Sequence, residues 1–351
     1  MWEYKISKYV LDFAFPAGTS RGILKHKTSF FIELYNKNYP LIKGIGEVSV
    51  IPGLSPDFQS DEEHLKSISF FCNEYFSKNN PFYDENELLQ HIQSDNNLRQ
   101  FPSILVALET AVLDLKNGGN RIIFINDFVK KVTKIPINGL IWMGEEDFMW
   151  QQIEDKINQS YRCIKLKIGG LDFEKECALL SKIRKKYGDS LVLRLDANGA
   201  FSFSNALDKL SELAHFNIHS IEQPIAKGHW DLMNTLCEKS PIPIALDEEL
   251  IAVFKKEDKK ALLEKIKPQF IVLKPSLHGG FIGCEEWIEL AEKSQIAWWI
   301  TSALESNIGL NAITQFTANY PIVLPHGLGT GKIYLNNIKS SLQVKNGFIV
   351  L

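Results

Sequence analysis

The spacing of hydrophobic residues changes along the chain and divides it into two parts. Residues 2–13 and 28–36 alternate between apolar and polar positions, which predicts two strands. Residues 61–76, DEEHLKSISFFCNEYF, begin with three acidic residues and continue with apolar residues at helical spacing, which predicts a helix. We therefore interpret residues 1–100 as an α+β unit.

A second, more apolar helix is predicted where this unit ends. Residues 101–119, FPSILVALETAVLDLKNGG, place Pro102 in a first helical turn and end on two glycines. Apolar residues between these signals recur at helical spacing. We interpret this helix as the one that leads into the second domain.

From about residue 134, short β-rich segments alternate with amphipathic segments. The amphipathic segments are long enough to cross back over a sheet, as parallel βα units require. The fold class predicted is thus α/β, a modified (β/α)₈ TIM-type barrel at residues 101–330 with an α+β capping domain at residues 1–100. Residues 331–351 are expected to return to the capping domain. The eight predicted strands are residues 136–143, 163–169, 191–198, 220–224, 243–248, 270–276, 296–304 and 321–329.

Composition narrows the function mainly by exclusion. The 351 residues carry a net charge of −3, so a dedicated nucleic-acid binder is not expected. The chain starts without a basic and then apolar leader, and no apolar run reaches the ~20 residues of a membrane span. The five scattered cysteines fit reduced thiols, which together with the missing leader predicts a cytoplasmic protein without a membrane partner.

Three acidic residues follow consecutive predicted strands. Asp196, Glu222 and Asp247 are separated by one βα unit each, so their side chains are expected to meet at the C-terminal rim of the barrel, where such folds build their active sites. One acid in this position is commonly a helix cap or a solvated charge. Three converging carboxylates repel one another unless a cation lies between them, and oxygen ligands alone suit a hard ion such as Mg²⁺.

Three lysines are expected around the same rim. Lys165 and Lys167 are two residues apart in one strand, so both point to the same face, the barrel interior. Lys274 ends the sixth strand, across the barrel from the second. A structural ion pair would explain one such lysine. Two facing lysines beside a metal instead favour removal of a proton next to a carboxylate, because the enediolate that forms needs concentrated positive charge.

These residues resemble the muconate-lactonizing subgroup of the enolase superfamily. The motifs are Lys165-x-Lys167, Asp196-x-Asn198, Glu222 in IEQP, Asp247-Glu248 in ALDE and Lys274 in VLKPS. The segments VALETAVLDL and GIGEVSVIPGLSPD also resemble the capping domain of that superfamily. The resemblance implies that Asp196, Glu222 and Asp247 bind Mg²⁺, with Mn²⁺ as the other candidate, and that Lys167 and Lys274 flank the substrate. Secondary roles in binding the substrate or orienting these groups fall to Lys165, Asn198, Glu248 and Ser302.

The ends of the last two predicted strands bear on the substrate. Dipeptide epimerases of this subgroup carry Asp-x-Asp after the eighth strand to bind an ammonium group, whereas this chain has VLPHGLGTGKIY there, without an acid. TSALESNIGL and GLGTGKIYLNN resemble the o-succinylbenzoate synthases of menaquinone biosynthesis. Their substrate is SHCHC (2-succinyl-6-hydroxy-2,4-cyclohexadiene-1-carboxylate), a small-molecule carboxylate. The implied reaction is a syn elimination of water through a metal-stabilised enediolate, with Lys167 as base and then acid and Lys274 as a stabilising cation.

Alternatives remain open from the residues alone. Within the subgroup these are an N-succinylamino acid racemase or another epimerase or cycloisomerase, and outside it a barrel that binds without catalysis. The intact set of two lysines and three acids disfavours the last. Residues 13–27, which contain Gly18 and Gly22, are expected to form a lid loop over the barrel mouth. The sequence does not distinguish a monomer from a homo-oligomer.

Overall fold

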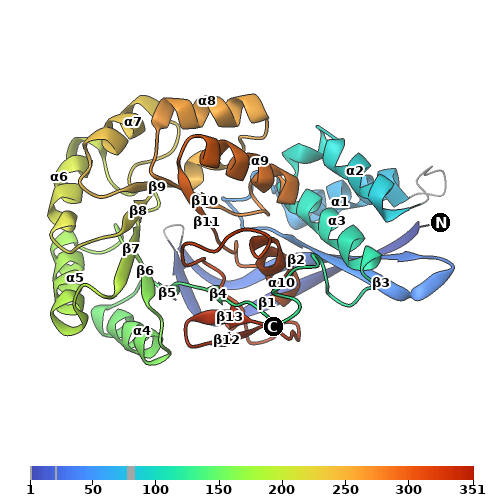
Figure 1. Ribbon diagram of the computed structural model, residues 1–351, viewed down its shortest axis with the longest axis horizontal. Helices are drawn as coiled ribbons and strands as arrows, with labels where there is room; N and C mark the ends of the chain where they lie inside the picture. Colours follow the sequence, from blue (N-terminus) through green and yellow to red (C-terminus); the bar gives the residue numbers. More distant parts are fainter. Residues whose placement is uncertain (1, 20–21, 77–83) are drawn as a thin grey trace.

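The computed structural model describes residues 2–19, 22–76 and 84–351. Its N-terminal unit contains an antiparallel sheet of β1 (Trp2–Thr19), β2 (Gly22–Asn36) and β3 (Tyr39–Ser49), in that spatial order. Three helices accompany the sheet on one side of the molecule (Figure 1), namely α1 (Asp61–Phe76), α2 (Glu85–Ser94) and α3 (Pro102–Lys116). A short 3₁₀ turn, η1 (Leu98–Gln100), precedes α3. The predicted helix over residues 61–76 is confirmed, as is the start of the next helix at Pro102.

The stretch expected to form a lid loop, residues 13–27, is strand rather than loop in its described residues, and its role as a lid stays a prediction. The described residues of this stretch continue β1 and β2 as paired strands, with a shift of register between Asp12 and Ala17. The composition of this stretch disfavours a helix. Pairing between strands gives its backbone N–H and C=O groups the hydrogen-bond partners that they need. Phe15 lies edge-on to Trp142 of the barrel, with ring centroids 5.7 Å apart, and Phe13 and Ala17 belong to the same buried cluster as Trp142. The hairpin is thereby anchored beside the barrel, and residues 20 and 21 lie outside the described part.

Helix α3 packs with the N-terminal unit. Its residues Ile104, Leu108 and Val112 belong to one buried cluster with side chains of β2 and α1. Glycines at positions 44 and 46 of β3 let the two backbones approach, because a Cβ at either position would overlap carbonyl oxygens of α3. The packing favours a domain boundary after α3, and we now propose that boundary in place of residue 101.

The second unit is a curved parallel sheet with helices on its outside. Seven strands pair in the order β11-β10-β9-β8-β7-β6-β5. The strands are β5 (Gly139–Ile141), β6 (Cys163–Lys167), β7 (Val192–Asp196), β8 (Ser220–Glu222), β9 (Ile244–Leu246), β10 (Phe270–Leu273) and β11 (Ala297–Ile300). Each is followed by a helix, and Figure 1 shows these helices in an arc around the strands. The helices are α4 (Glu146–Asn158), α5 (Phe173–Tyr187), α6 (Phe203–Ala214), α7 (Trp230–Lys239), α8 (Lys256–Ile266), α9 (Gly280–Lys293) and α10 (Asn307–Thr317), with a 3₁₀ turn η2 (Glu248–Leu250) before α8.

The eighth predicted strand, residues 321–329, is wrong as a regular strand. Only His326 and Gly327 form isolated bridges in this stretch, to Ile137 and Thr301 respectively. Two prolines in the segment cannot donate to a ladder, which limits the regular pairing available to it. The hydrogen bonds Asn138 N to His326 O and Gly327 N to Ile300 O, both 2.9 Å, still join β11 to the start of the sheet and close the barrel.

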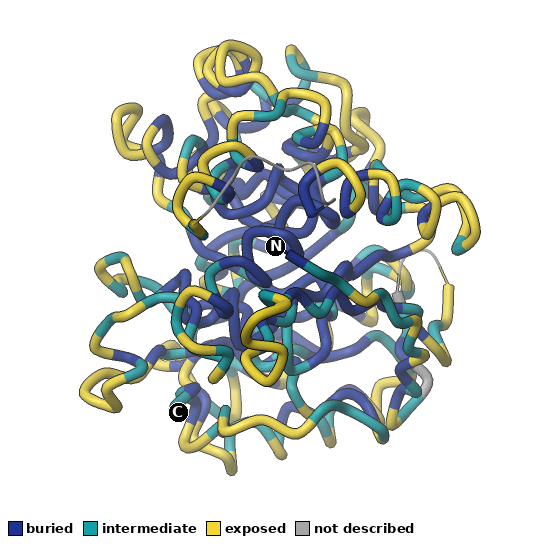
Figure 2. Tube along the Cα trace, turned by 90° about the vertical axis from the view of Figure 1, so that its right-hand side faces the viewer, coloured by how far each residue is buried: buried dark blue, intermediate teal, exposed yellow. Residues whose placement is uncertain are grey.

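The C-terminal segment contacts both units. Tyr334 pairs with Phe13 of β1, and the side chain of Asn336 accepts a 2.8 Å bond from the backbone of Asp12. Further on, β12 (Gln343–Lys345) and β13 (Phe348–Val350) form a hairpin. Its second strand, β13, pairs with β4 (Ile135–Pro136), which directly precedes the first barrel strand. Figure 2 shows buried residues concentrated in the interior and exposed ones on the outer loops. No helix in the described part of the chain is long and apolar enough to cross a membrane.

Candidate active site

A cavity of about 270 Å³ lies at the C-terminal ends of the barrel strands. The sequence-predicted residues that line it come from β6, from β7 and the loop after it, and from the segments after β9, β10 and β11. Among the nine predicted residues only Glu222 is absent from its wall. Strand ends that meet at one rim explain why residues up to 137 positions apart share this cavity. The predicted residues in the wall are Lys165, Lys167, Asp196, Asn198, Asp247, Glu248, Lys274 and Ser302.

The three predicted acids lie at the ends of neighbouring strands. Asp196 is in register with Glu222, and Glu222 pairs with Ala245, two residues before Asp247. Lys165 reaches between the first two acids, forming ion pairs with Asp196 at 3.0 Å and with Glu222. The sheet geometry thus brings the acids and Lys165 into one buried cluster.

The charges in this cluster change one another's protonation. Burial alone lowers the pKa of Lys165, but Asp196, Glu222 and Asp247 together raise it above its ordinary value. Burial raises the pKa of Glu222 to about 7, with Asp196 and Asp247 adding to the effect and Lys165 opposing it. The pKa of Asp196 is lowered because Lys165 and Lys167 outweigh its burial. Several buried carboxylates this close together stay ionised only when cations lie next to them.

Lys167 and Asn198 form a second contact at the same rim. The Lys167 amine donates to Asn198 Oδ1 at 2.7 Å and lies 3.3 Å from Asp196 Oδ2. Asn198 in turn donates from Nδ2 to Glu248 Oε1 at 3.0 Å. Asn198 therefore links the lysine of the second barrel strand to the acid that follows the fifth.

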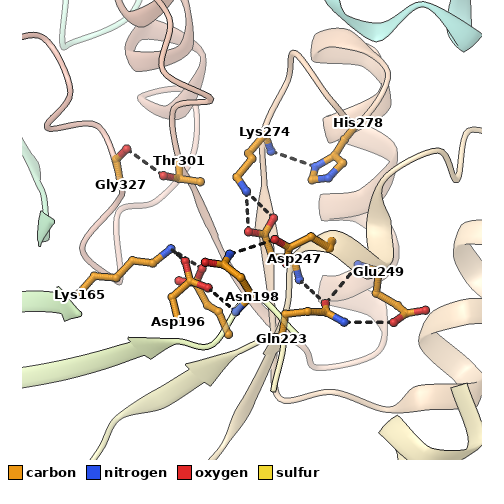
Figure 3. Close-up of polar contacts among 12 residues, drawn as sticks. Lys165, Asp196, Asn198, Gln223, Asp247, Glu249, Lys274, His278, Thr301 and Gly327 are labelled. Atoms are coloured by element: carbon orange, nitrogen blue, oxygen red, sulfur yellow. Dashed lines mark hydrogen bonds and ion pairs between the residues drawn. The ribbon is translucent and has the colours of Figure 1, made fainter. Parts of the chain in front are cut away.

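Lys274 lies on the opposite wall of the cavity from Lys167, since β7, β8 and β9 separate β6 from β10 in the sheet. Its amine donates to both oxygens of Asp247 at 2.5 Å (Figure 3). Burial lowers the pKa of Lys274, but Asp247 and Glu248 raise it overall. Its backbone N–H donates to His278 Nδ1 at 2.9 Å, which fixes the start of the loop after β10.

Gln223 and Glu249 hold the loop of Asp247 and were missed by the sequence reasoning. Gln223 Oε1 accepts from the backbone N–H groups of Asp247 (3.3 Å) and Glu249 (3.2 Å), and Gln223 Nε2 donates to Glu249 Oε2. Gln223 has a left-handed backbone with φ of 39°, which is costly for a non-glycine residue. Gln223 lies in the IEQP motif and Glu249 directly follows the ALDE motif, but spacing alone did not indicate that the two residues contact.

Ser302 lines the cavity with its hydroxyl already engaged. Its Oγ donates to Glu305 Oε2 at 2.6 Å and accepts from the Glu305 N–H at 3.3 Å. Glu305 also accepts from Ser276 at 2.6 Å, which lies two residues after Lys274. Glu305 therefore ties together the loops after β10 and β11.

The remaining wall is largely apolar and comes in part from the N-terminal unit. Leu24, Ile51 and Leu54 line the cavity together with Leu140 and Trp142 of the barrel. Sequence reasoning did not identify these residues, because apolar side chains in a strand or loop carry no signal that separates a substrate wall from a core. The cavity thus combines a charged floor with an apolar roof, which suits an anion attached to a hydrocarbon ring.

The acids fit a hard divalent cation by their chemistry. They offer carboxylate oxygens alone, and Glu222 Oε1 is buried without a hydrogen-bond partner in the described residues. In the described part of the chain no three His, Cys, Asp or Glu side chains are grouped as a ready metal site. The amines of Lys165 and Lys274 lie against the carboxylates instead, so cation binding requires these amines to move aside.

Comparison with known proteins identifies relatives over the whole chain. An o-succinylbenzoate synthase from Desulfotalea psychrophila is 46% identical over 97% of this chain and 96% of its own length. The crystal structure of MenC from the same organism superposes with a TM-score of 0.87 at 42% identity, covering 100% of this chain and 99% of that chain. The N-succinyl Arg/Lys racemase from Bacillus cereus has a TM-score of 0.85 at 19% identity, covering 99% and 92% of the two chains. The last likeness concerns the fold alone.

Residues 149–351 match the family described as enolase C-terminal domain-like. The matched region begins in α4 and includes all nine predicted site residues. Together with the relative that is 46% identical over nearly its full length, this match decides the family. The barrel, the antiparallel capping unit and the resemblance of the motifs agree with it. The chain belongs to the enolase superfamily.

Proposed function

We propose that the protein is a Mg²⁺-dependent hydro-lyase, an o-succinylbenzoate synthase, that dehydrates SHCHC to 2-succinylbenzoate in menaquinone biosynthesis. The observation that carries the proposal is the placement of Lys167 and Lys274 on opposite walls of one cavity beside the three acids. Nearly full-length identity of 46% to an o-succinylbenzoate synthase supports the substrate. We place the activity in the cytoplasm, on a small-molecule carboxylate.

Asp196, Glu222 and Asp247 would hold the metal ion. When bound, Mg²⁺ supplies positive charge that stabilises negative charge developing on the substrate carboxylate. Asn198 and Glu248 would keep the rim ordered around these acids, because Asn198 joins Lys167 to Glu248. Lys165 would neutralise the acids and help to hold the substrate carboxylate, since it already contacts Asp196 and Glu222.

The two facing lysines account for the elimination. Lys167, as a neutral amine, takes the proton from C1 of the ring, next to the carboxylate. The electron pair of that C–H bond forms a ring double bond as the C6–OH bond breaks, and the Lys167 ammonium returns its proton to the departing hydroxyl. Water leaves and the ring becomes aromatic, so atoms and charge balance. Lys274, held cationic beside the opposite face, stabilises the charge that builds up on the substrate.

Racemisation of N-succinylamino acids is the second candidate, because two facing lysines could also remove and return a proton on opposite faces. The acid-free end of the eighth segment fits either N-acylated substrate or SHCHC, since neither carries an ammonium group. The sequence of this segment thus supports a substrate class without a cation, and turnover decides between the two.

The experiment incubates the purified full chain and Mg²⁺ with SHCHC and follows the loss of its absorbance and the appearance of 2-succinylbenzoate. Lys167→Ala should abolish turnover, whereas Lys182→Ala, which removes an exposed lysine of α5 paired with Glu146, should not. A parallel assay in ²H₂O measures exchange of the α-proton of N-succinylamino acids. Exchange without SHCHC turnover would replace the synthase by the racemase, and full activity of Lys167→Ala would remove the proposed base.

A further inference from the structure

The backbone of Gln223 is bonded to the strands and loops on both sides of it. Gln223 directly follows Glu222, the last residue of β8. Its backbone carbonyl accepts a hydrogen bond from Gly199 N at 2.6 Å, in the loop after β7. Its backbone N–H donates to Ala245 O at 2.9 Å, in β9. Gln223 therefore joins the end of β8 to both neighbouring barrel strands, whose C-terminal ends carry the other two proposed metal ligands.

The side chain of Gln223 reaches the loop after β9, in which Asp247 lies (Figure 3). Its Oε1 accepts from the backbone N–H groups of Asp247 at 3.3 Å and of Glu249 at 3.2 Å. Its Nε2 donates to Ile225 O at 3.1 Å and to Glu249 Oε2 at 3.2 Å. An amide side chain has two donors and two acceptor positions, so all four are used in a residue that is 1% exposed.

The neighbours of this amide fix its orientation. The backbone N–H groups of Asp247 and Glu249 can only donate, whereas Ile225 O and the Glu249 carboxylate accept. A flipped amide would set donors against donors and its oxygen against two acceptors. Glu249 is itself held, because its Oε1 accepts from Gly228 N at 2.8 Å in the loop after β8. Glu249 thereby aims the oxygen of Gln223 at the backbone of Asp247.

Backbone strain at Gln223 indicates that its side chain is needed there. Its φ of 39° lies in the left-handed region, which is costly for a residue with a Cβ. Glycine adopts this conformation without that cost but offers no amide. Such strain persists only where the surrounding structure enforces it, and it is concentrated at functional sites. The hydrogen bonds of the amide offset the strain, so the chain retains a glutamine in a position suited to glycine.

We propose that Gln223 is a positioning residue that holds the three carboxylates at the spacing a divalent cation requires. The inference rests on the proposed function, in which Asp196, Glu222 and Asp247 bind Mg²⁺. Gln223 lies outside the described wall of the catalytic cavity, so it acts through the segments that carry these acids. Mg²⁺ demands near-ideal octahedral geometry, so a small displacement of one carboxylate weakens its binding. Groups that orient metal ligands typically contribute about 10–100-fold to metal affinity.

The test titrates the EDTA-treated full chain with Mn²⁺, whose electron paramagnetic resonance signal weakens when the ion binds. Gln223→Met keeps the length of the side chain but removes the amide, and should raise the Kd for Mn²⁺ about 10–100-fold. Turnover of SHCHC by this variant should recover as Mg²⁺ is raised to saturation, because metal affinity is what is lost. Glu249→Gln is a milder second variant that takes one acceptor from the Gln223 amide, and should raise the Kd for Mn²⁺ by a smaller factor.

The matched control is Gln315→Met. Gln315 of α10 is also buried, and its Oε1 accepts from the backbone N–H groups of Ile123 at 2.8 Å and Phe124 at 3.2 Å. Its Nε2 donates to Arg121 O at 2.8 Å, and the residue lies outside the described wall of the catalytic cavity. The control therefore removes a similarly bonded amide away from the acids. It should lower the free energy of unfolding but leave the Kd for Mn²⁺ unchanged.

An unchanged Kd for Mn²⁺ in both Gln223→Met and Glu249→Gln would overturn the proposal. So would an equal rise in Gln315→Met, since general loosening of the fold would then explain the loss of affinity. An unmodified protein that binds no Mn²⁺ would overturn it together with the metal site of the proposed function. Weaker Mn²⁺ binding by Gln223→Met, in a protein that does not turn over SHCHC, would support the inference and reject only the proposed substrate.

Discussion

Glu47 is expected to be the most important single contact between the capping unit and the barrel. It lies on β3, is 2% exposed, and accepts four hydrogen bonds. One comes from Ser29 Oγ at 2.8 Å in its own sheet. The other three come from the start of α10, namely Ser306 N at 2.9 Å, Ser306 Oγ at 2.6 Å and Gly309 N at 2.9 Å.

Replacing Glu47 by alanine would leave buried donors unpaired in both units. It would also remove an acid that faces Lys27, whose amine is buried and donates to Ser29 at 3.0 Å and Ser49 at 2.7 Å. Burial lowers the pKa of Lys27, and Glu47 and Glu305 raise it, so the loss of Glu47 also disfavours the charged amine. A buried donor left without its acceptor costs about 1–3 kcal/mol, so the loss of two or three such contacts should cost about 3–5 kcal/mol in total, a large part of the roughly 5–15 kcal/mol that stabilises a folded protein.

The assay is urea unfolding of the full chain followed by circular dichroism and tryptophan fluorescence. Glu47→Ala should lower the free energy of unfolding by about 3–5 kcal/mol and Glu47→Gln by less, because the amide keeps one acceptor oxygen. The control Glu62→Ala removes an acid that is 80% exposed and pairs with Lys66, a contact expected to contribute about 0–1 kcal/mol.

The same change should also reach the active site. Ser306 caps α10 and directly follows Glu305 and the segment 302–304, which lines the cavity. A displaced cap should therefore lower kcat/KM for the proposed reaction. If Glu47→Ala were as stable as the Glu62→Ala control and equally active, the reasoning about this contact would be refuted.

Three further predictions follow from the packing and the charges. Gly46→Ala should lower the free energy of unfolding by about 1–3 kcal/mol in the same assay, because the added Cβ would overlap the carbonyl oxygen of Ala107. An unchanged midpoint of urea unfolding would show that β3 and α3 can separate at no cost. Burial raises the pKa of Glu109 to about 7, so the folded state holds this proton more tightly than the unfolded state. The contribution of Glu109 to stability should therefore be greatest below pH 4.5 and fall by roughly 3 kcal/mol as the pH rises to 7. Glu109→Gln should remove this contribution, and an identical pH dependence of stability in the variant and the unmodified protein would contradict the assignment. Mg²⁺ should raise the melting temperature of the EDTA-treated protein but not of Asp247→Asn, and an equal rise in both would exclude Asp247 as a ligand.

Much of the site could be predicted from local sequence patterns, for definite reasons. A strand exposes alternate residues to the same face, so Lys165 and Lys167 had to point the same way once residues 163–169 formed a strand. Regular βα spacing placed Asp196, Glu222 and Asp247 on adjacent strand ends. The structure brings these groups together, while the roles we assign to them stay predictions for the experiments above.

Other features depend on contacts that no local pattern encodes. The apolar character of residues 321–329 is typical of a buried strand, but His326 and Gly327 form only isolated bridges there. Residues 13–27 were expected to form a loop because they show few helix signals, but in their described part, residues 13–19 and 22–27, they continue β1 and β2 alongside the barrel. In each case the local sequence permits more than one backbone, and the neighbouring elements select between them.

By itself, then, the sequence determined which residues face the interior of each strand and how far apart the acids and lysines lie, because strand and βα periods are short-range properties. Only the tertiary structure decided which side chains are left with unused hydrogen bonds. Glu47 meets Ser306 across 259 residues, and Thr330 and Asn138 line the same cavity although they lie far apart in the sequence. Whether a polar side chain is satisfied depends on every neighbour that packing brings to it, and periodicity along the chain carries no record of those neighbours.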